Sequence, residues 1–354
     1  MESILERRAI RWDGAPAEKR TMKLSIIILC WNDLKVIGDC LQSIYATTHT
    51  TEFEIIVSDN GSTDGSIEFI RTNYPDVQVI ENGRNLRFAR ANNVGIRVSR
   101  GEYILILNPD TILHEGTIDK VIAIADKHPE AGGFGCRVLN SDGTYQACIR
   151  PFPSLRSEWI AALRLGFLGH ISEWFSPGIY VGWKGETERT IGWPAGCFIL
   201  LRGDLLKQLG GFDEQFFYYH EDMDLCNRVW KAGYAVLYTP EATLTHLGGH
   251  STSKRFPPLG FALDGQVTRY RYFYKHFGKR GARQSRWVVL VSLSIRRTGL
   301  SLIQLVRPTE YRKAKLELLK TLFRWNYRVD PVRLVENNEE PELGIKPVGR
   351  VLER

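Results

Sequence analysis

Three carboxylates stand within four positions of the chain, at Glu221, Asp222 and Asp224. The simplest interpretation is the first turn of a helix, where acidic side chains interact favourably with the helix dipole. A helix end does not require three of them, however, and repulsion between neighbouring carboxylates raises the pKa of at least one. A carboxylate with a raised pKa is suited to general-base catalysis. We therefore expect a catalytic cluster, in which Asp222 is the base and Glu221 tunes its pKa or orients the substrate.

Another acidic residue, Asp110, follows an apolar run and ends the sequence Asn108-Pro109-Asp110. The tripeptide alone favours only a turn. However, Mg²⁺ and Mn²⁺ bind oxygen ligands and share them with substrate phosphates. Asp110 is therefore a candidate ligand for a divalent metal, Mn²⁺ or Mg²⁺, that takes up charge on a leaving diphosphate. His246 is a candidate second ligand, although a lone histidine is more often structural, and His250 is a weaker candidate.

A third candidate lies in residues 58–64, which read SDNGSTD. One interpretation is a turn before a helix, since Asn-Gly favours a turn and Thr63 or Asp64 can cap the helix. The other is a ligand contact, because the Asp59 carboxylate can accept hydrogen bonds from a base or a ribose hydroxyl. The segment by itself leaves both open.

A regular alternation of strands and helices places these candidates. The expected strands are 24–30, 53–57, 77–80 and 103–107, and the expected helices are 33–45, 64–73 and 88–98. This alternation predicts an α/β fold with a mainly parallel central sheet, in which ligands bind beyond the carboxyl ends of the strands. Asn32, Asp59 and Asp110 all follow such ends, so we expect them to meet at one edge of the sheet.

The pattern changes after residue 134. Residues 150–190 are rich in Trp, Pro and Gly, which indicates a loop-rich region for binding a second substrate. A strand is expected at 192–201, a helix at 221–232, and basic amphipathic helices from 265 onward. We predict a loose arm at 1–22, a catalytic domain at 23–260 divided at 112, a helical extension at 261–335 and a disordered tail at 336–354.

The composition, 43% hydrophobic and 25% charged with a net charge of +7, is that of a globular protein and excludes wholesale disorder. None of the six cysteines has a C-x-x-C spacing, which argues against a zinc cluster and favours a reducing cytoplasm. The N-terminus lacks the apolar core of a signal peptide, and the longest apolar stretch, 287–295, is too short to span a bilayer. We expect a chain that does not cross a membrane.

In this order, the motifs resemble the family 2 inverting glycosyltransferases, which have the GT-A fold. The sub-group closest in appearance is that of the rhamnosyltransferase-like enzymes of bacterial cell-surface polysaccharide assembly. The likeness covers roughly residues 23–250. It rests on residues 24–28, Asn32, 57–64, Asn85, 88–89, 92–93, Gly95, 107–110, Gly196, 211–214, Phe217, 221–225 and His246. Each piece alone is common, but the ordered set is specific.

The resemblance implies a single in-line displacement that inverts the anomeric carbon of a nucleotide-sugar. Residues 23–112 would bind the donor and residues 113–260 the acceptor. Asp59 would contact the base, Asp110 and His246 would serve the metal or diphosphate, and Asp222 would deprotonate the acceptor hydroxyl. The donor contacts expected on this basis are Cys30, Asn32, Asp59, Asn60, Asn85, Arg87, Ala89, Asn93 and Asn108. The expected acceptor contacts are Trp193, Ala195, Gly196 and Asp224.

Two residues depart from the family pattern. Arg87 stands where these enzymes often have glycine, and an arginine there could pair with the diphosphate. Asn108 replaces the first acid of the D-x-D motif, which leaves Asp110 as the main carboxylate on the metal. The sequence has no Q-x-x-R-W motif, which argues against a processive synthase.

The expected reaction is transfer of rhamnose from dTDP-rhamnose to a glycan or a polyprenyl-diphosphate-linked glycan in cell-surface polysaccharide synthesis. The alternatives are another sugar (galactofuranose, mannose, GlcNAc or glucose) from a UDP or GDP donor, and a non-catalytic nucleotide-binding scaffold. A dehydrogenase is excluded, because Cys30-Trp31-Asn32 stands where such an enzyme carries G-x-G-x-x-G.

The segment 287–306 has two interpretations, packing against the catalytic domain or contact with an anionic membrane surface. Membrane contact would suit a lipid-linked acceptor and a peripheral location on the inner face of the cytoplasmic membrane. No feature of the sequence indicates a nucleic-acid partner, and a homodimer is left open.

Overall fold

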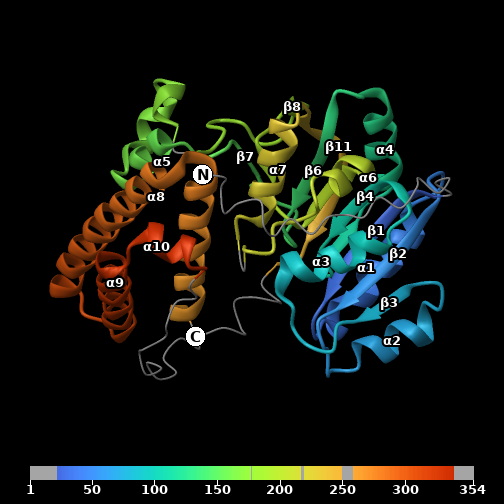
Figure 1. Cartoon of the computed structure of the whole chain (residues 1–354), viewed down its shortest axis with the longest axis horizontal. Helices are drawn as coiled ribbons and strands as arrows, with labels where there is room; N and C mark the ends of the chain where they lie inside the picture. Colours follow the sequence, from blue (N-terminus) through green and yellow to red (C-terminus); the bar gives the residue numbers. More distant parts are fainter. Residues whose placement is uncertain (1–21, 177, 217–218, 249–257, 339–354) are drawn as a thin grey trace. The chain divides into compact units, whose positions relative to one another are not determined.

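The computed structural model describes residues 22–176, 178–216, 219–248 and 258–338. The predictions for residues 1–21 and 339–354, and those that involve Phe217 and His250, lie outside the described residues. The chain divides into two compact units (Figure 1). The first comprises Met1–Phe152, Trp183–Glu214 and Glu221–Lys254, and the second comprises Pro153–Gly182, Gln215–His220 and Arg255–Arg354. The predicted division into a catalytic domain and a helical extension stays a prediction.

The first unit is built on a mixed sheet with the strand order β3-β2-β1-β4-β10-β6-β11-β5, and β8 pairs with β11. Its amino-terminal half is parallel: β1 (Met22–Cys30) lies between β2 (Phe53–Asp59) and β4 (Gly101–Leu107), and β3 (Gln78–Glu81) pairs with β2. The connecting helices are α1 (Leu34–Thr47), α2 (Ser66–Asn73) and α3 (Arg87–Val98). The predicted α/β fold of the GT-A type is confirmed, and the predicted elements agree with these bounds to within two residues.

The second half of the sheet mixes directions. Strand β10 (Phe198–Arg202) is antiparallel to both β4 and β6 (Ala131–Leu139). Strand β11 (Ala235–His246) is parallel to β6 and antiparallel to β5 (Thr111–Leu113). The remaining elements of this unit are α4 (Thr117–Lys127), β7 (Ile149–Arg150), β8 (Arg189–Thr190), β9 (Trp193–Pro194), α6 (Gly203–Gln208) and α7 (Glu221–Lys231).

The single strand predicted at 192–201 is wrong, because the structure divides this stretch into β9 and β10. The backbone between them forms other hydrogen bonds. The Ala195 N–H donates to the Cys148 carbonyl at 2.8 Å, and the Gly196 N–H donates to the Asp222 carboxylate at 3.0 Å. Residues 195–197 therefore leave the sheet in order to reach a side chain that lies far away in the sequence.

The core lies on both faces of the parallel strands. Ile26, Ile27 and Ile28 of β1 are all fully buried, as expected for a central strand with helices on both sides. Helix α3 approaches β1 closely at Gly95, where an added Cβ would lie 2.7 Å from Cγ2 of Ile27. The apolar side chains that predict the strands are thus packed against the helices, and this packing fixes the position of the strands and of their carboxyl ends.

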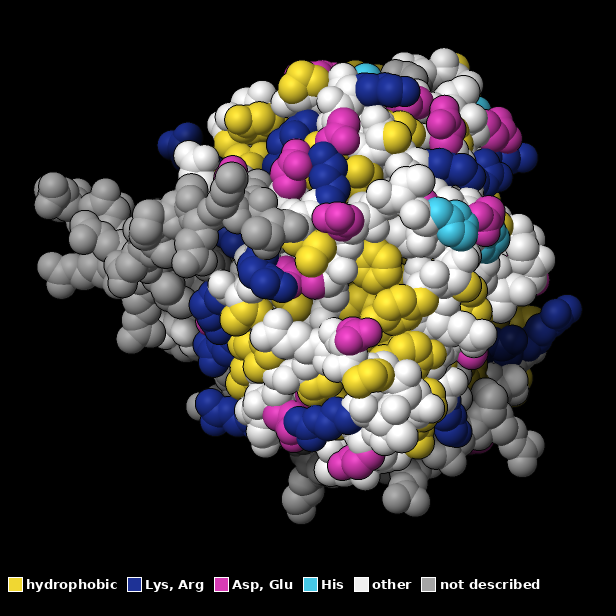
Figure 2. All heavy atoms as spheres, turned by 90° about the vertical axis from the view of Figure 1, so that its right-hand side faces the viewer, with side chains coloured by type: hydrophobic (Ala, Val, Ile, Leu, Met, Phe, Trp, Pro, Cys, Tyr) yellow, Lys and Arg dark blue, Asp and Glu magenta, His cyan; other side chains and the backbone are white. Residues whose placement is uncertain are grey.

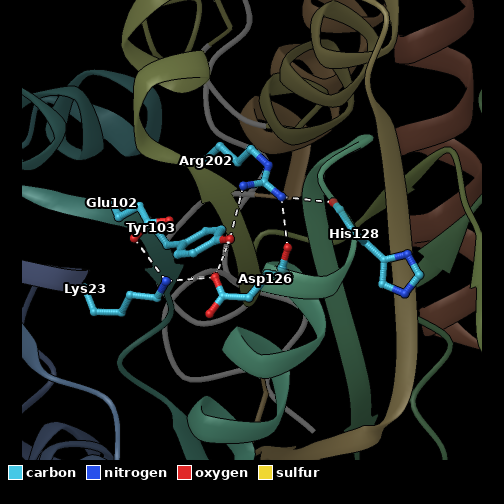
Figure 3. Close-up of polar contacts among 7 residues, drawn as sticks. Lys23, Glu102, Tyr103, Asp126, His128 and Arg202 are labelled. Atoms are coloured by element: carbon cyan, nitrogen blue, oxygen red, sulfur yellow. Dashed lines mark hydrogen bonds and ion pairs between the residues drawn. The ribbon is translucent and has the colours of Figure 1, made fainter.

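A polar network ties the opposite, amino-terminal edge of these strands together (Figure 3). The Lys23 ammonium contacts Glu102 at 3.0 Å and Asp126 at 2.8 Å. The Arg202 guanidinium donates to the Tyr103 hydroxyl at 3.1 Å and, near the end of α4, to the carbonyls of Ala125 and His128, both at 2.9 Å (Figure 3). It also donates to the Ala131 carbonyl at 2.7 Å. This network fixes β1, β4, β10 and α4 at the edge away from the candidate residues.

The second unit is helical. It contains α5 (Leu155–Ala162), two short 3₁₀ turns (Leu165–His170 and Glu173–Phe175), α8 (Pro258–Val306), α9 (Glu310–Arg328) and α10 (Pro331–Glu336). Helix α8 is kinked at Gly278, whose φ of 69° interrupts the helical backbone. Leu263, Val289 and Leu293 of α8 form a core with Leu319 and Leu322 of α9. The basic helices predicted from residue 265 onward are confirmed, whereas α5 is a helix within the region predicted to be loop-rich.

Charge is distributed unevenly along the chain. Residues 258–338 contain 17 Lys and Arg against 5 Asp and Glu, a surplus of 12 positive charges. Because the whole chain has a formal charge of +7, the remaining residues carry a net charge of −5. On the face drawn in Figure 2, Lys and Arg side chains are interspersed with Asp and Glu side chains. The excess of basic residues therefore belongs to the helices of the second unit.

Candidate active site

The candidate residues of the parallel strands meet at one edge, as predicted. In the register of the sheet, Cys30 at the end of β1 lies opposite Asp59 at the end of β2. On the other side of β1, Ile28 lies opposite Leu107, the last residue of β4. The loops that follow these three strands carry Asn32, Asn60 and Asp110. The parallel arrangement therefore gathers the donor-side candidates at the carboxyl edge of the sheet.

Asp59 and Asn32 fasten the first two loops to each other. The buried Asp59 carboxylate accepts hydrogen bonds from the N–H groups of Gly61 at 3.0 Å and Ser62 at 3.1 Å. Asn32, with a φ of 55°, accepts a hydrogen bond from the Thr63 N–H at 2.6 Å, and its own N–H donates to the Ser62 hydroxyl at 2.9 Å. Both interpretations of the 58–64 segment thus stay open, because Asp59 holds the turn at the place where a ligand contact is predicted.

A second set of amides shapes the start of α3. The Asn60 side chain donates to Oδ1 of Asn85 at 3.3 Å and accepts from the Leu86 N–H at 3.1 Å. Asn85 in turn accepts from the Arg87 N–H at 2.8 Å. Arg87 has a φ of 69°, a conformation that glycine adopts without strain and arginine does not. At Arg87, where the resemblance leads us to expect glycine, the backbone therefore has the conformation that glycine favours.

Two further donor-side candidates have structural contacts. Ala89 is buried in α3. The amide of Asn93 donates to the Phe212 carbonyl at 2.9 Å and accepts from the Phe212 N–H at 2.8 Å. It also donates to Glu214 at 3.2 Å. Asn93 thus binds α3 to residues 211–214, and the predicted contact of Asn93 with the donor stays a prediction.

Asp110 and His246 face each other. Oδ1 of Asp110 lies 3.2 Å from Nε2 of His246, and the pairing of β5 with β11 places Thr111 opposite His246. On the other side of the ring, Nδ1 lies 2.8 Å from Oε1 of Gln146, whose amide nitrogen donates to Asn140 at 2.8 Å. This second contact fixes the orientation of the amide, so Gln146 accepts the proton of Nδ1 and Nε2 is directed at the carboxylate.

The environment of His246 has opposing effects on its pKa. Burial alone would lower it, but the hydrogen bond and the negative charge of Asp110 outweigh burial and raise the pKa of His246. A histidine that donates one ring nitrogen to a fixed oxygen and directs the other at a carboxylate has the arrangement of a metal-ligating histidine. Within the described residues, no cluster of three or more His, Cys, Asp or Glu suited to a metal ion occurs. The pair fits an ion that completes its coordination with diphosphate oxygens and water.

Asp222 is held by backbone groups. Its carboxylate accepts from the Gly196 N–H at 3.0 Å and from the Met223 N–H at 2.7 Å. Burial raises the pKa of Asp222 to about 6, although these two hydrogen bonds act in the opposite direction. Burial and the charge of Asp222 raise the pKa of Glu221 well above its usual range. Both carboxyl groups of this adjacent pair therefore bind a proton more readily than an exposed carboxyl group does, which suits the pair to proton transfer.

Two buried polar atoms near this pair have no hydrogen-bond partner within the described part of the chain, Oε2 of Glu221 and Nε1 of Trp193. Such groups are costly to leave unpaired, and a substrate hydroxyl would satisfy them. The predicted acceptor residue Asp224 differs from them. It is fully buried and pairs with Arg228 at 2.9 Å, and Arg228 also donates to the carbonyls of Leu209 and Gly211.

Residues 193–197 connect the two parts of the candidate site. The Gly196 N–H binds Asp222, and the Cys197 carbonyl accepts from the Asn108 N–H at 3.2 Å. The Ala195 N–H binds the carbonyl of Cys148, two residues after Gln146. This segment therefore contacts the Asp222 carboxylate, the turn that carries Asp110 and the segment that carries Gln146, the residue that orients His246. Sequence reasoning missed Gln146 and Arg228, because neither belongs to a motif and Gln146 is 100 positions from His246.

The sequence and fold are similar to those of known proteins. Residues 25–175 match the model of glycosyl transferase family 2. An N-acetylglucosaminyl-diphospho-decaprenol L-rhamnosyltransferase of Mycobacterium tuberculosis is 31% identical over 74% of this chain and 87% of its own length. The rhamnosyltransferase WbbL of Escherichia coli is 27% identical over 58% of this chain and 76% of its own length.

One solved structure supports the fold. GalNAc-T7, crystallised with UDP, GalNAc and Mn²⁺, superposes with a TM-score of 0.51 at 13% identity, over 89% of this chain and 58% of its own length. At this level of identity, the likeness concerns the arrangement of strands and helices alone.

Proposed function

The chain belongs to glycosyl transferase family 2, and on this basis we propose that it transfers rhamnose from dTDP-rhamnose to a polyprenyl-diphosphate-linked glycan. The names of the relatives from Mycobacterium tuberculosis and Escherichia coli support rhamnose, and that of the first supports a lipid-linked acceptor. Such a reaction is a step of bacterial cell-surface polysaccharide synthesis and takes place at the inner face of the cytoplasmic membrane.

The observation that carries the proposal is the state of Asp222. Its carboxylate is buried, with a pKa of about 6, and is fixed by the Gly196 N–H, in the segment that also holds the Asp110 turn. In the proposed step, Asp222 accepts the proton of the acceptor hydroxyl, whose oxygen attacks the anomeric carbon. The bond from that carbon to the diphosphate breaks on the opposite face, and the anomeric configuration inverts.

The other residues bind and orient the substrates. Glu221 forms a hydrogen bond with an acceptor hydroxyl through its unpaired Oε2, and the Trp193 indole N–H donates to a second acceptor oxygen. The loops with Asn32, Asp59 and Asn60 surround the nucleotide. Besides their predicted substrate contacts, Asn93 and Asp224 hold neighbouring segments of the protein, because both side chains are bound within it.

The side chains of Asp110 and His246 would hold the divalent cation, Mn²⁺ or Mg²⁺. When bound, the cation neutralises negative charge on the leaving diphosphate. The alignment of His246 by Gln146 supports this assignment, because a salt bridge with Asp110 does not require a second oriented contact.

A non-catalytic nucleotide-binding scaffold is the second candidate. It is disfavoured because two adjacent buried carboxyl groups with raised pKa values destabilise the fold, and a scaffold gains nothing from them.

Purified protein with Mn²⁺ should convert dTDP-rhamnose and a synthetic polyprenyl-diphosphate-GlcNAc acceptor to a disaccharide lipid. The proposed donor would be wrong if the protein does not turn over dTDP-rhamnose but does turn over one of the alternatives, UDP-galactofuranose, GDP-mannose, UDP-GlcNAc or UDP-glucose. No turnover with any donor, together with nucleotide binding, would favour the scaffold.

A further inference from the structure

Apolar side chains are exposed where α8 ends and α9 begins. Leu305 and Val306 are each 80% exposed, Leu302 is 60% exposed and Ile303 is 50% exposed. Tyr311, in the first turn of α9, is 57% exposed. We refer to these five residues as the apolar tip. At 100° per residue, the four that belong to α8 cover an arc of about 160° of the helix surface. One neighbouring helix cannot cover so wide an arc.

Other apolar side chains of α8 are packed inside the protein. Val288, Leu290 and Leu293 are buried, and Leu293 contacts the core shared with α9. By length and composition alone, the segment Ala262–Val306 could cross a membrane. Only 22% of its most apolar 18-residue window is buried in the protein, so most of this window is exposed. The exposed part of that window includes the last turn of the helix. Among the large apolar side chains of residues 287–306, Leu305 and Val306 have the largest exposed fractions, 80% each, so we place the membrane hypothesis for this segment at the apolar tip.

Basic side chains flank the apolar tip on both helices. Residues 296–315 contain six Lys and Arg and one acidic residue, Glu310. We refer to the six as the basic rim: Arg296, Arg297, Arg307, Arg312, Lys313 and Lys315. Arg296, Arg307, Lys313 and Lys315 are exposed, and Arg297 and Arg312 are half-buried. Exposed apolar side chains next to clustered positive charge are typical of segments that bind anionic lipid surfaces.

We propose that the apolar tip inserts into the interface of an anionic bilayer while the basic rim binds lipid phosphates. The alternative occupant is a second copy of the chain, joined tip to tip. That contact would bring two basic rims together, and like charges at an interface are unfavourable. An anionic surface is complementary to the same charges. The proposal goes beyond the proposed reaction, because it depends only on the exposure and charge of this part of the second unit.

Vesicle co-sedimentation of the full-length protein tests the proposal. The probes are vesicles of phosphatidylcholine alone and of phosphatidylcholine with 30% phosphatidylglycerol. We expect binding to the anionic vesicles at least tenfold above the neutral ones, weakened by 0.5 M NaCl. The double variant Leu305→Ser/Val306→Ser should reduce the partition coefficient about tenfold or more, because each inserted methylene contributes to binding. The variant Arg307→Glu/Lys313→Glu should abolish the preference for the anionic vesicles.

The matched control is Ile171→Ser, which removes an apolar side chain of the same unit that is 81% exposed. This variant should bind vesicles as the wild type does. All three variants should unfold at the wild-type temperature and transfer sugar to a detergent-dispersed acceptor at the wild-type rate, so a failed lipid test is distinguishable from a failed reaction. Equal binding to both kinds of vesicle, or unchanged binding by Leu305→Ser/Val306→Ser, would overturn the proposal. A dimer in sedimentation velocity that this variant dissociates would assign the tip to a second copy.

Discussion

The buried carboxylate of Asp222 is the proposed general base, and a single substitution tests this role. Replacing it by asparagine keeps the size of the side chain and an oxygen that can accept the Gly196 N–H, but removes the proton acceptor. We expect Asp222→Asn to lower kcat by about 10³-fold, within the range for loss of a general base and its charge. Nucleotide affinity, measured by calorimetry, should change less than about threefold. Retention of near-normal turnover would exclude Asp222 as the base.

The pH profile tests the same residue without a mutation. A base acts only when it is ionised, and burial raises the pKa of Asp222 to about 6. The value of kcat/KM should therefore rise tenfold per pH unit below about 6 and become level above it. A carboxylate with an ordinary pKa would place this rise near pH 4. The profile is measured with the metal at saturation at every pH, and a level profile between pH 5 and 8 would contradict the assignment.

Gln146 offers a residue-scale test of the metal assignment. Its carbonyl oxygen holds Nδ1 of His246 at 2.8 Å, and such outer contacts typically contribute 10- to 100-fold in metal affinity. We expect Gln146→Leu to weaken Mn²⁺ binding, followed by the paramagnetic resonance of free Mn²⁺ in the presence of dTDP, by about that factor. Ser141→Ala, which changes an exposed residue of the same loop, is the control. Unchanged Mn²⁺ affinity in Gln146→Leu would mean that His246 is not a ligand.

At the scale of elements, the apolar pattern predicts the strands and helices of residues 22–107 well, because most of them bury the apolar side chains that form the pattern. Strand β3, at the end of the sheet, is predicted correctly although none of its residues is buried. The pattern fails at 192–201, where the backbone leaves the sheet to bind Asp222. No local pattern in the sequence predicts a contact with a side chain 26 positions away. Sequence analysis misses Gln146 for the same reason, because its contact with His246 is also distant in the sequence. Motifs identify residues that touch ligands, whereas the residues that orient them are identified only by contacts.

Arg202 joins several elements at the edge opposite the candidate site (Figure 3). Its guanidinium donates to three backbone carbonyls and to the Tyr103 hydroxyl. Because hydrogen bonds from charged groups contribute about 1.5–3 kcal/mol each when lost, Arg202→Ala should lower the free energy of unfolding by about 3 kcal/mol, measured in urea. The control Arg90→Ala removes an arginine that is 52% exposed and paired with Glu214, and should cost less than about 1 kcal/mol. Equal effects would show that the network does not hold these elements.

The loop that precedes α7 is anchored by α8 within the second unit. The buried Arg271 donates to the Gln215 carbonyl and, at 2.9 Å, to Asn338. Tyr219 and His220 both have positive φ, at 63° and 71°, a strained conformation that surrounding contacts must maintain. Glu221 and Asp222 follow directly in the chain. The strained residues Tyr219 and His220 therefore directly precede, in the chain, the helix that carries the candidate base.

Replacement of Arg271 by alanine removes its hydrogen bonds to Gln215 and Asn338. We expect a 10- to 100-fold loss in kcat, because small displacements of a catalytic group have effects of this size. Donor affinity should be unchanged, since the donor-side candidates belong to the first unit. The control on the same helix is Lys279→Ala, whose side chain is 59% exposed and pairs with Glu336. Loss of donor affinity in parallel with kcat would indicate general unfolding instead of a displaced base.

At the scale of the whole molecule, the proposed donor site and the proposed membrane contact fall in two units of opposite charge. All the donor-side and base candidates lie in the first unit, while the surplus of 12 positive charges lies in residues 258–338 of the second. A soluble nucleotide-sugar and an anionic lipid surface would thus be recognised by different parts of the chain. If this division is correct, a ligand of one unit should stabilise that unit more than the other.

Hydrogen exchange measures this division directly. A ligand at 100 times its Kd stabilises the state that binds it by about 2.7 kcal/mol, which slows exchange through unfolding about 100-fold. With dTDP and Mn²⁺ at that excess, we expect such slowing for the buried amides of β1, β2 and β4 in the first unit. The amides of α9, whose core is formed with α8, should exchange at nearly the same rate as without ligand. Arg202→Ala should accelerate exchange in the first set only. Equal slowing in α9 would mean that the two units unfold together, because ligand binding to one would then protect both.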